Sequence, residues 1–164
     1  MYWITIVIFI IDQLTKWLIR LSLKPGATIT IISHLFNILH SRNKGAAFGM
    51  FQDYSQYLTV LTFVAIFLIL YLFVTTPSKD KLLRASYGMI LGGALGNLYD
   101  RIIYGYVTDF LDFHIGQYSW PTFNIADSSI SIAIILIIYD AIKKERAHTK
   151  ALIKKEFPSE NILE

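Results

Sequence analysis

Three aspartates in the second half of the chain, Asp100, Asp109 and Asp127, lie beside hydrophobic segments. An ionised carboxylate at the edge of a bilayer is energetically costly, and membrane proteins usually keep one because it has a function. Two unpaired carboxylates in a partly dry site cannot both ionise cheaply, so they share a proton at working pH. The charged member can then take a proton from water while the neutral member donates one to a carbonyl oxygen. These residues therefore predict either paired-carboxylate hydrolysis or an ion path.

The sequence context favours Asp109 and Asp127 as the pair. Asp109 has no Lys or Arg within seven positions on either side, and Asp127 has no cation nearby in the sequence. Asp100 precedes Arg101, whose permanent charge would hold this carboxylate ionised and structurally occupied. Helix capping is a competing explanation for all three aspartates. The residues alone therefore leave the choice between Asp109 and Asp100 open.

Two asparagines share the spacing Asn-x-x-Asp with these aspartates: Asn97 precedes Asp100, and Asn124 precedes Asp127. On a helix this spacing places both side chains on one face. An asparagine amide can donate a hydrogen bond to a carboxylate one turn later and fix its rotamer. We therefore expect each asparagine to support the aspartate that follows it.

Other kinds of catalytic centre are missing from the sequence. The chain has no Cys, and its four His residues lack a metal-binding spacing, so we expect neither a metal nor a thiolate nucleophile. No Ser lies in a nucleophile elbow, and the glycine-rich residues 92–96 are better explained by helix packing than by a phosphate loop. Nothing indicates a cofactor or nucleic acid binding. His114 is expected at the membrane interface, and Asp112 is expected to be a surface charge.

The composition is that of a membrane protein. Of 164 residues, 54% are hydrophobic and 16% are charged, whereas a soluble domain is typically about 45–50% apolar and about 25% charged. In the first hydrophobic segment Asp12 and Lys16 are four residues apart, so they share a helix face and can neutralise each other. We predict an α-helical integral membrane protein with four transmembrane helices, over about residues 2–23, 57–74, 82–104 and 123–142.

The segments between these spans differ in character. Residues 24–56 contain strand-like stretches at 28–31 and 35–39, which predict a small extracytoplasmic β-sheet. Residues 105–122 are mixed aromatic and polar, which predicts an interfacial helix or loop. Gly88, Gly92 and Gly96 fall on one face of the third span, so another helix can approach it closely.

The distribution of charge predicts the orientation in the membrane. There is no Lys or Arg from Ile102 to Ile142, but there are six from Lys143 to Lys155. The positive-inside rule therefore places the tail, both termini and the basic 75–84 loop in the cytoplasm, with the 24–56 and 105–122 segments outside. We divide the chain into a four-helix membrane domain, residues 1–146, and a basic and polar cytoplasmic tail, residues 147–164. The tail is expected to meet anionic lipid headgroups.

Five short motifs now resemble the lipoprotein signal peptidase family, also called signal peptidase II. They occur in this order along about residues 10–140: 12–16 (DQLTK), 42–49 (RNKGAAFG), 96–101 (GNLYDR), 107–110 (VTDF) and 123–128 (FNIADS). Each motif is weak alone, but five in order with four spans are highly specific. Departures from the family pattern are small, such as Thr108 in place of a more common aliphatic residue.

The resemblance implies an aspartic endopeptidase of the bacterial plasma membrane. Such an enzyme removes the signal peptide from diacylglyceryl-modified prolipoproteins, cutting just before the lipidated cysteine, and is inhibited by globomycin. The family's catalytic pair falls on Asp109 and Asp127. Its other motif residues would bind substrate or support the site, and here they are Asp12, Lys16, Asn43, Gly45, Asn97, Asp100, Arg101 and Asn124. Membrane lipids and the lipidated precursor are the partners that the resemblance implies.

A small proton- or ion-coupled transporter is the alternative, because it would also need intramembrane Asp and Asn residues. A short chain with four spans and no evident internal repeat offers little room for alternating access. Proteolysis or ion-dependent uptake would distinguish the two classes.

Overall fold

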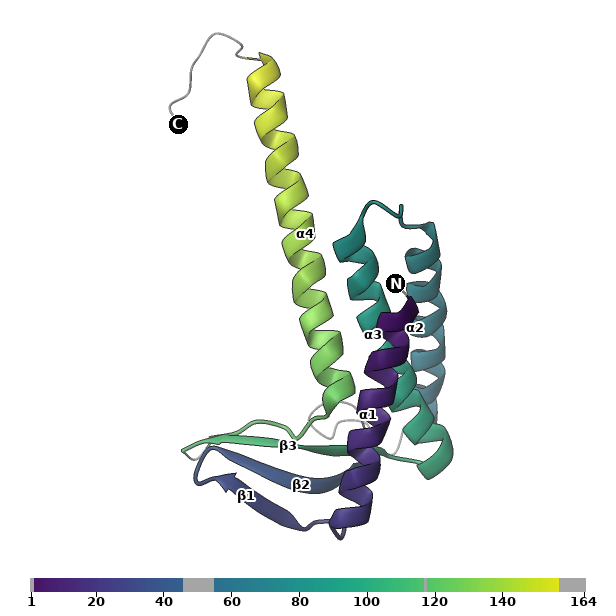
Figure 1. Ribbon diagram of the computed structural model, residues 1–164, viewed down its shortest axis with the longest axis vertical. Coiled ribbons are helices and arrows are strands. Elements are labelled where there is room, and N and C mark those ends of the chain that lie inside the picture. The colour runs from purple at the N-terminus through teal and green to yellow at the C-terminus, as the bar shows by residue number, and fades with distance from the viewer. Residues whose placement is uncertain (1, 46–54, 117, 157–164) are drawn as a thin grey trace.

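A computed structural model describes residues 2–45, 55–116 and 118–156 of the chain. The described residues form four helices and four strands (Figure 1). In chain order the elements are α1 Tyr2–Ser22, β1 Thr28–Ile32, β2 Phe36–Asn43, α2 Ser55–Thr75, α3 Lys81–Tyr104, β3 Val107–Ile115, β4 Tyr118–Ser119 and α4 Ile125–Glu156.

Helix α3 is the centre of the helical layer and contacts α1, α2 and α4. Its glycines permit close approach on two sides. A Cβ at Gly92 would lie 2.8 Å from the Thr5 carbonyl oxygen of α1, and a Cβ at Gly93 would lie 2.5 Å from the Ala126 carbonyl oxygen of α4. The expected close helix packing at the glycine face is therefore confirmed, and Gly93 adds a second close contact on the α4 side.

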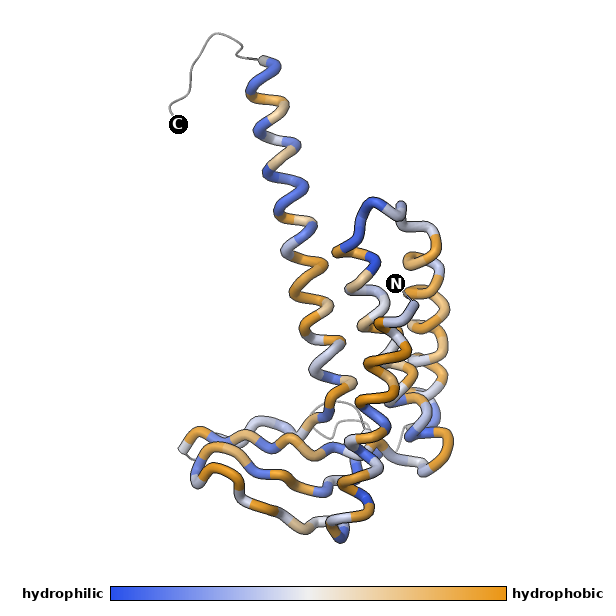
Figure 2. The backbone as a smooth tube through the Cα atoms, in the orientation of Figure 1, coloured by the Kyte–Doolittle hydropathy of each residue, from blue (hydrophilic) through white to orange (hydrophobic). Residues whose placement is uncertain are grey.

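Two of the described helices, α2 and α4, are long and apolar enough to cross a membrane. Apolar side chains of α2 such as Val60, Leu61 and Phe67 are more than 60% exposed in the isolated chain. The apolar surface continues over the middle of the helical layer, while the connection between α2 and α3 and the far end of α4 are hydrophilic (Figure 2). Exposed apolar surface of this extent is typical of a protein solvated by lipid.

The strands form an antiparallel sheet in the order β1-β2-β3-β4, which lies across one end of the helices (Figure 1). The prediction of a helix or loop over residues 105–122 is wrong, because Val107–Ile115 is a strand of this sheet. Two causes act together: this stretch is rich in Val, Thr, Phe and Ile, which favour strands, and β2 presents a backbone edge whose polar groups need partners. The register places Ser41 of β2 opposite Asp109 of β3.

Helix α4 is longer than the predicted span. It contains 32 residues and continues without a break past Ile142 to Glu156. At about 1.5 Å per residue it is about 48 Å long, and its basic end projects beyond the other helices (Figures 1 and 2). The tail has good helix formers and no Gly or Pro before residue 158, so nothing ends the helix at the edge of the apolar stretch.

Candidate active site

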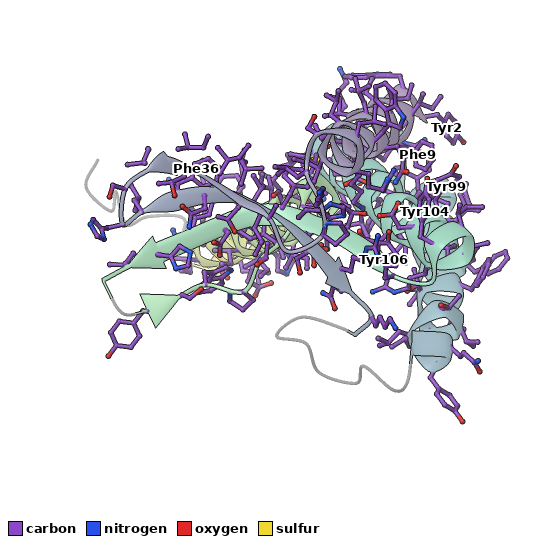
Figure 3. The ribbon with its side chains drawn as sticks, turned by 90° about the horizontal axis from the view of Figure 1, so that it is seen from below. Tyr2, Phe9, Phe36, Tyr99, Tyr104 and Tyr106 are labelled. Carbon is purple, nitrogen blue, oxygen red and sulfur yellow. The ribbon has the colours of Figure 1, made fainter. Side chains whose placement is uncertain are left out.

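The sheet and the helices meet around a cavity of about 530 Å³. Seen from the sheet end, the strands pass across the ends of the helices, and Tyr104 and Tyr106 mark the turn from α3 into β3 (Figure 3). The described lining residues come from the end of β2 and the residues just after it, from α3, β3, the connection between β4 and α4, and the start of α4. The polar ones include Asn43, Asn97, Arg101, Asp109, Asp127, Ser128 and Ser131. Both carboxylates that the sequence favoured therefore open on the same cavity.

Asp109 lies on β3 and is 2% exposed. Its Oδ2 accepts a hydrogen bond from Nδ2 of Asn43 at 2.9 Å, and its Oδ1 accepts one from Nδ2 of Asn124 at 2.6 Å. Burial and, second, the charge of Asp127 raise the pKa of Asp109 to about 7, although the two amide donors act in the opposite direction. Asp109 is thus the carboxylate of the site that can hold a proton near neutral pH.

Asp127 lies in the first turn of α4 and is half-buried. Asn124 and Asp127 form a reciprocal cap: Asn124 Oδ1 accepts from the Asp127 N–H at 3.0 Å, and Asp127 Oδ2 accepts from the Asn124 N–H at 3.2 Å. The side chain at the cap position is therefore that of Asn124. The second oxygen of Asp127, Oδ1, accepts from Nδ2 of Asn97 at 2.8 Å.

Asn124 supports Asp127 as expected, through the reciprocal cap, but neither asparagine donates its side-chain NH₂ group to the aspartate that the spacing predicted. The side-chain amide of Asn97 reaches Asp127 rather than Asp100, and that of Asn124 reaches Asp109 rather than Asp127. This difference from the expected contacts has a geometric cause, because the close packing of α3 on α4 brings the two asparagines together. Nδ2 of Asn124 lies 3.2 Å from Oδ1 of Asn97. Each amide thereby links two elements of the site.

Beneath the cavity, α1 contributes a buried cluster of charges. Lys16 and Asp12 form the expected ion pair at 2.9 Å, and both side chains are fully buried. Lys16 also lies 3.6 Å from Asp100. The free oxygen of Asp12, Oδ1, accepts from the backbone N–H of Ala126 at 2.9 Å, so this carboxylate ties α1 to the start of α4.

The expectation that Arg101 balances Asp100 is wrong. Asp100 contacts Lys16 and, at 3.4 Å, Arg20, and it accepts from the Thr108 N–H at 2.9 Å. Arg101 lines the cavity, donates to the Gly45 carbonyl at 3.3 Å and interacts electrostatically first with Asp127 and then with Asp109. The physical reason is that successive residues of a helix do not face each other.

Two residues of this region were missed as parts of the site. Arg20 is one turn beyond Lys16 and donates to Oγ1 of Thr108 at 3.0 Å. Thr108 is fully buried and immediately precedes Asp109, so this contact anchors β3 to α1. The sequence signal was present, because Asp12, Lys16 and Arg20 recur every four residues and share one helix face.

Asp112 is not the expected surface charge. It is 6% exposed, accepts from Asn37 of β2 at 3.1 Å and pairs with His114 at 2.5 Å. The strand register explains its burial, because Asn37 lies directly opposite it. Part of the motif at residues 42–49, namely residues 46–49, lies outside the described residues.

Comparison with known proteins gives consistent similarities. Residues 4–143 match the family described as signal peptidase (SPase) II. The chain is 39% identical to a lipoprotein signal peptidase of Alteromonas mediterranea over 145 residues, which cover 86% of this chain and 79% of the relative. It is 38% identical to that of Vibrio parahaemolyticus over 148 residues, 87% of this chain and 88% of the relative.

Two solved structures have a similar fold. The fold is similar to a bacterial membrane enzyme solved by the in meso method at 2.3 Å resolution, with a TM-score of 0.81, 35% identity and coverage of 87% of both chains. A second, solved at 1.9 Å resolution, has a TM-score of 0.77 and 36% identity over 85% of this chain and 90% of that one.

Proposed function

Because the chain belongs to the signal peptidase II family of proteases, we propose that it removes the signal peptide from diacylglyceryl-modified prolipoproteins. The bond cut is the one just before the lipidated cysteine. Asp109 and Asp127 are the catalytic carboxylates in this proposal. One observation carries it: all four oxygens of this pair accept a hydrogen bond from an N–H donor, while both residues line one cavity.

The geometry suits hydrolysis by a shared proton. The ionised carboxylate removes a proton from a water molecule, and the water oxygen attacks the scissile carbonyl carbon. The neutral carboxylic acid gives its proton to the carbonyl oxygen. When the C–N bond breaks, the departing cysteine nitrogen takes a proton from the dyad and is released as the new amino terminus. No further reactant is needed, since water supplies both the hydroxyl group and the proton.

The supporting residues have distinct roles in the proposal. Asn43, Asn97 and Asn124 hold the two carboxylates in place through their amides. Arg101 and Gly45, which are hydrogen-bonded to each other on the cavity wall, are positioned to bind the substrate backbone. Asp12, Lys16 and Asp100 hold α1, α3 and α4 together beneath the site.

We propose that all four helices span the bacterial plasma membrane. The charged and polar side chains that interrupt α1 and α3 are satisfied by one another, since Asp12, Lys16 and Asp100 are each fully buried. The start of α1, the end of α4 and the α2–α3 connection lie towards the end opposite the sheet (Figure 1). With the basic end cytoplasmic, the sheet and the active site face outward.

This placement fits a lipidated substrate. The acyl chains of the precursor remain in the bilayer, so its scissile bond lies near the membrane surface. A cavity between the sheet and the helix ends is at that depth. Membrane lipids are therefore expected around the helices, residues 1–146 form the peptidase domain, and residues 147–164 form a cytoplasmic tail. Globomycin is expected to occupy the same cavity.

The experiment is cleavage of a diacylglyceryl-modified prolipoprotein by the purified protein in detergent. Wild type should cut before the lipidated cysteine. Asp109→Asn and Asp127→Asn should each fold but lose activity by at least about 10³-fold, because each removes one half of the proton exchange. Asp112→Asn, on the same strand but away from the cavity lining, is the matched control and should retain cleavage. Cleavage by Asp109→Asn at the wild-type rate would reject the assigned pair.

A further inference from the structure

A second cavity, of about 540 Å³, lies at the far end of β3. The described residues that line it carry no charge, and most of them have a large apolar or aromatic side chain. They are Phe113, Ile115, Tyr118, Ser119, Trp120 and Phe123. Trp120 and Phe123 also line the active-site cavity, so the two cavities are neighbours. The hydrolysis proposed above uses only the first of them.

Both cavities lie on one face of β3. Side chains alternate between the two faces of a strand, and the irregularity in the pairing of β2 with β3 is an extra residue on β2, so the alternation continues along β3. Leu111, Phe113 and Ile115 therefore share the face of Asp109. At about 3.3 Å per residue, the distance along the strand from Asp109 to Ile115 is about 20 Å. An apolar path of this length leads from one carboxylate of the site to the end of the sheet.

Backbone pairing and stacked rings hold the path in shape. The Phe113 ring is stacked between those of Phe36, at 4.6 Å, and Phe123, at 5.9 Å. The backbone N–H of Phe123 donates to the Leu111 carbonyl at 3.0 Å, and that of Trp120 donates to the Phe113 carbonyl at 2.8 Å. The two residues that line both cavities are thus fixed on β3 by their backbones. The path is formed before any ligand arrives, as ligand pockets usually are.

The outer end of the path is open. Ile115 is 74% exposed and Tyr118 is 85% exposed. Strand β3 runs outward from the helical layer, and its far end projects past the base of α4 (Figure 1). Figure 3 shows Phe36 on this extended part of the sheet. Because Asp109 faces the helix ends, the same face of β3 further out is turned towards the side on which the helices lie. In the proposed topology that side is the outer leaflet of the bilayer.

The proposed substrate has a part with the same chemistry as the path. Its acyl chains are joined through glycerol to the cysteine beside the scissile bond, so they must lie close to the dyad during the reaction. An acyl chain has no polar group to hydrogen-bond, and leaving apolar surroundings for water is unfavourable. The scissile bond, however, has to reach polar, hydrogen-bonded carboxylates. An apolar path that begins at the dyad lets the chain remain in apolar surroundings while the bond is cut.

We propose that the face of β3 from Leu111 to Ile115, together with the second cavity, binds one acyl chain of the diacylglyceryl group. This site selects precursors by their lipid, and it prefers long chains to short ones. The proposal rests on the proposed function and assigns lipid recognition to a part of the protein outside the dyad. The occupant is a chain of the substrate, because the cavity adjoins the active site through Trp120 and Phe123.

The test removes apolar surface from the outer end of the path. In Ile115→Thr/Tyr118→Thr both changes are at exposed residues that pair across β3 and β4, neither lines the active-site cavity, and threonine favours a strand. If this variant does not fold, Tyr118→Thr alone replaces it. Ile29→Thr/Ile31→Thr is the matched control. It removes similar exposed surface from β1, on the same sheet but outside both cavities.

The measurement is kcat and KM, in one detergent, for two precursors of the same peptide sequence. One carries a dipalmitoylglyceryl group, and the other a dihexanoylglyceryl group whose chains are too short to reach the end of the path. Wild type should have the lower KM for the long chains. In Ile115→Thr/Tyr118→Thr we expect KM for the long-chain precursor to rise about tenfold. Its kcat, and both constants for the short-chain precursor, should stay at wild-type values, and the β1 control should behave as wild type with both precursors.

Three results would overturn the inference while the proposed function stands. KM for the long-chain precursor could be unmoved in Ile115→Thr/Tyr118→Thr, or KM could rise equally for both precursors. The β1 control could raise KM for the long-chain precursor as much, which would mean that the sheet only contacts bulk lipid or detergent. If wild type cuts neither precursor, the proposed function itself fails and the inference falls with it.

Discussion

At the scale of residues, the site depends on amide groups whose orientation is set by neighbours that cannot accept a hydrogen bond. The ammonium of Lys16 fixes Asn97, and the backbone N–H of Asp127 fixes Asn124, whose NH₂ group then faces Asp109. A carboxylate that receives a donor on each oxygen loses rotamer freedom before substrate arrives. This preorganisation lowers the reorganisation needed during the reaction.

The pH dependence of activity follows from Asp109. Burial beside Asp127 raises its pKa to about 7, so Asp109 is neutral below this pH and ionised above it. Hydrolysis needs one proton on the pair, and kcat should therefore fall as pH rises through about 7. Asn43→Ala removes a donor that favours the ionised form, so the pKa rises further and the alkaline limb should move to higher pH. Steady-state kinetics across this range measure both effects, and an alkaline limb that moves to lower pH in Asn43→Ala would contradict them.

At the scale of elements, hydrophobic periodicity and charge predicted the helices well and the connection between α3 and α4 poorly. The predicted spans at 57–74 and 82–104 agree closely with α2 and α3. Residues 105–122 were misjudged because β3 takes its partner from β2, which lies more than sixty positions earlier. The strand-favouring residues of β3 were a local signal, but its distant pairing partner could not be recognised from neighbouring residues. The site residues were recognised by type and motif, but the crossed pairing of Asn97 and Asn124 depends on packing between helices.

The packing of α4 on α3 should control activity through Gly93. A Cβ there would lie 2.5 Å from the Ala126 carbonyl oxygen and 2.7 Å from the Ser129 hydroxyl oxygen, so Gly93→Ala must push the start of α4 away. Overpacking of this kind typically costs about 1–3 kcal/mol. Because Asp127 lies in that turn, we expect kcat to fall together with stability, measured by cleavage assays and thermal unfolding in detergent.

Gly88→Ala is the matched control on the same helix. A Cβ there would make ordinary contacts, at 3.5 Å, with Ile4 and Thr5. Replacing Gly by Ala in a helix interior is favourable by up to about 1 kcal/mol, so this variant should be as stable as wild type or more so. Equal loss of activity in both variants would show that Gly93 has no special role.

At the scale of the whole molecule, the sheet and the charged ends define two different surfaces on either side of an apolar layer (Figure 2). The active-site cavity lies at the sheet end, and the basic part of α4 lies at the other end. Residues 4–143 match the family, so most of the projecting end of α4 lies beyond the shared part of the fold. The site therefore depends on the membrane-embedded part of the chain, and the orientation of that part decides which side of the membrane the cavity faces.

The chain has no Cys, so single cysteines can report this orientation without background. Thr30→Cys lies on exposed β1, and Ser78→Cys lies in the exposed connection between α2 and α3. The outward placement of the sheet predicts that a membrane-impermeant maleimide labels Thr30→Cys in intact cells, whereas Ser78→Cys reacts only after the membrane is permeabilised. Thr149→Cys, on the exposed far end of α4, should behave like Ser78→Cys. The reverse pattern would place the cavity on the cytoplasmic side and would reject the proposed topology.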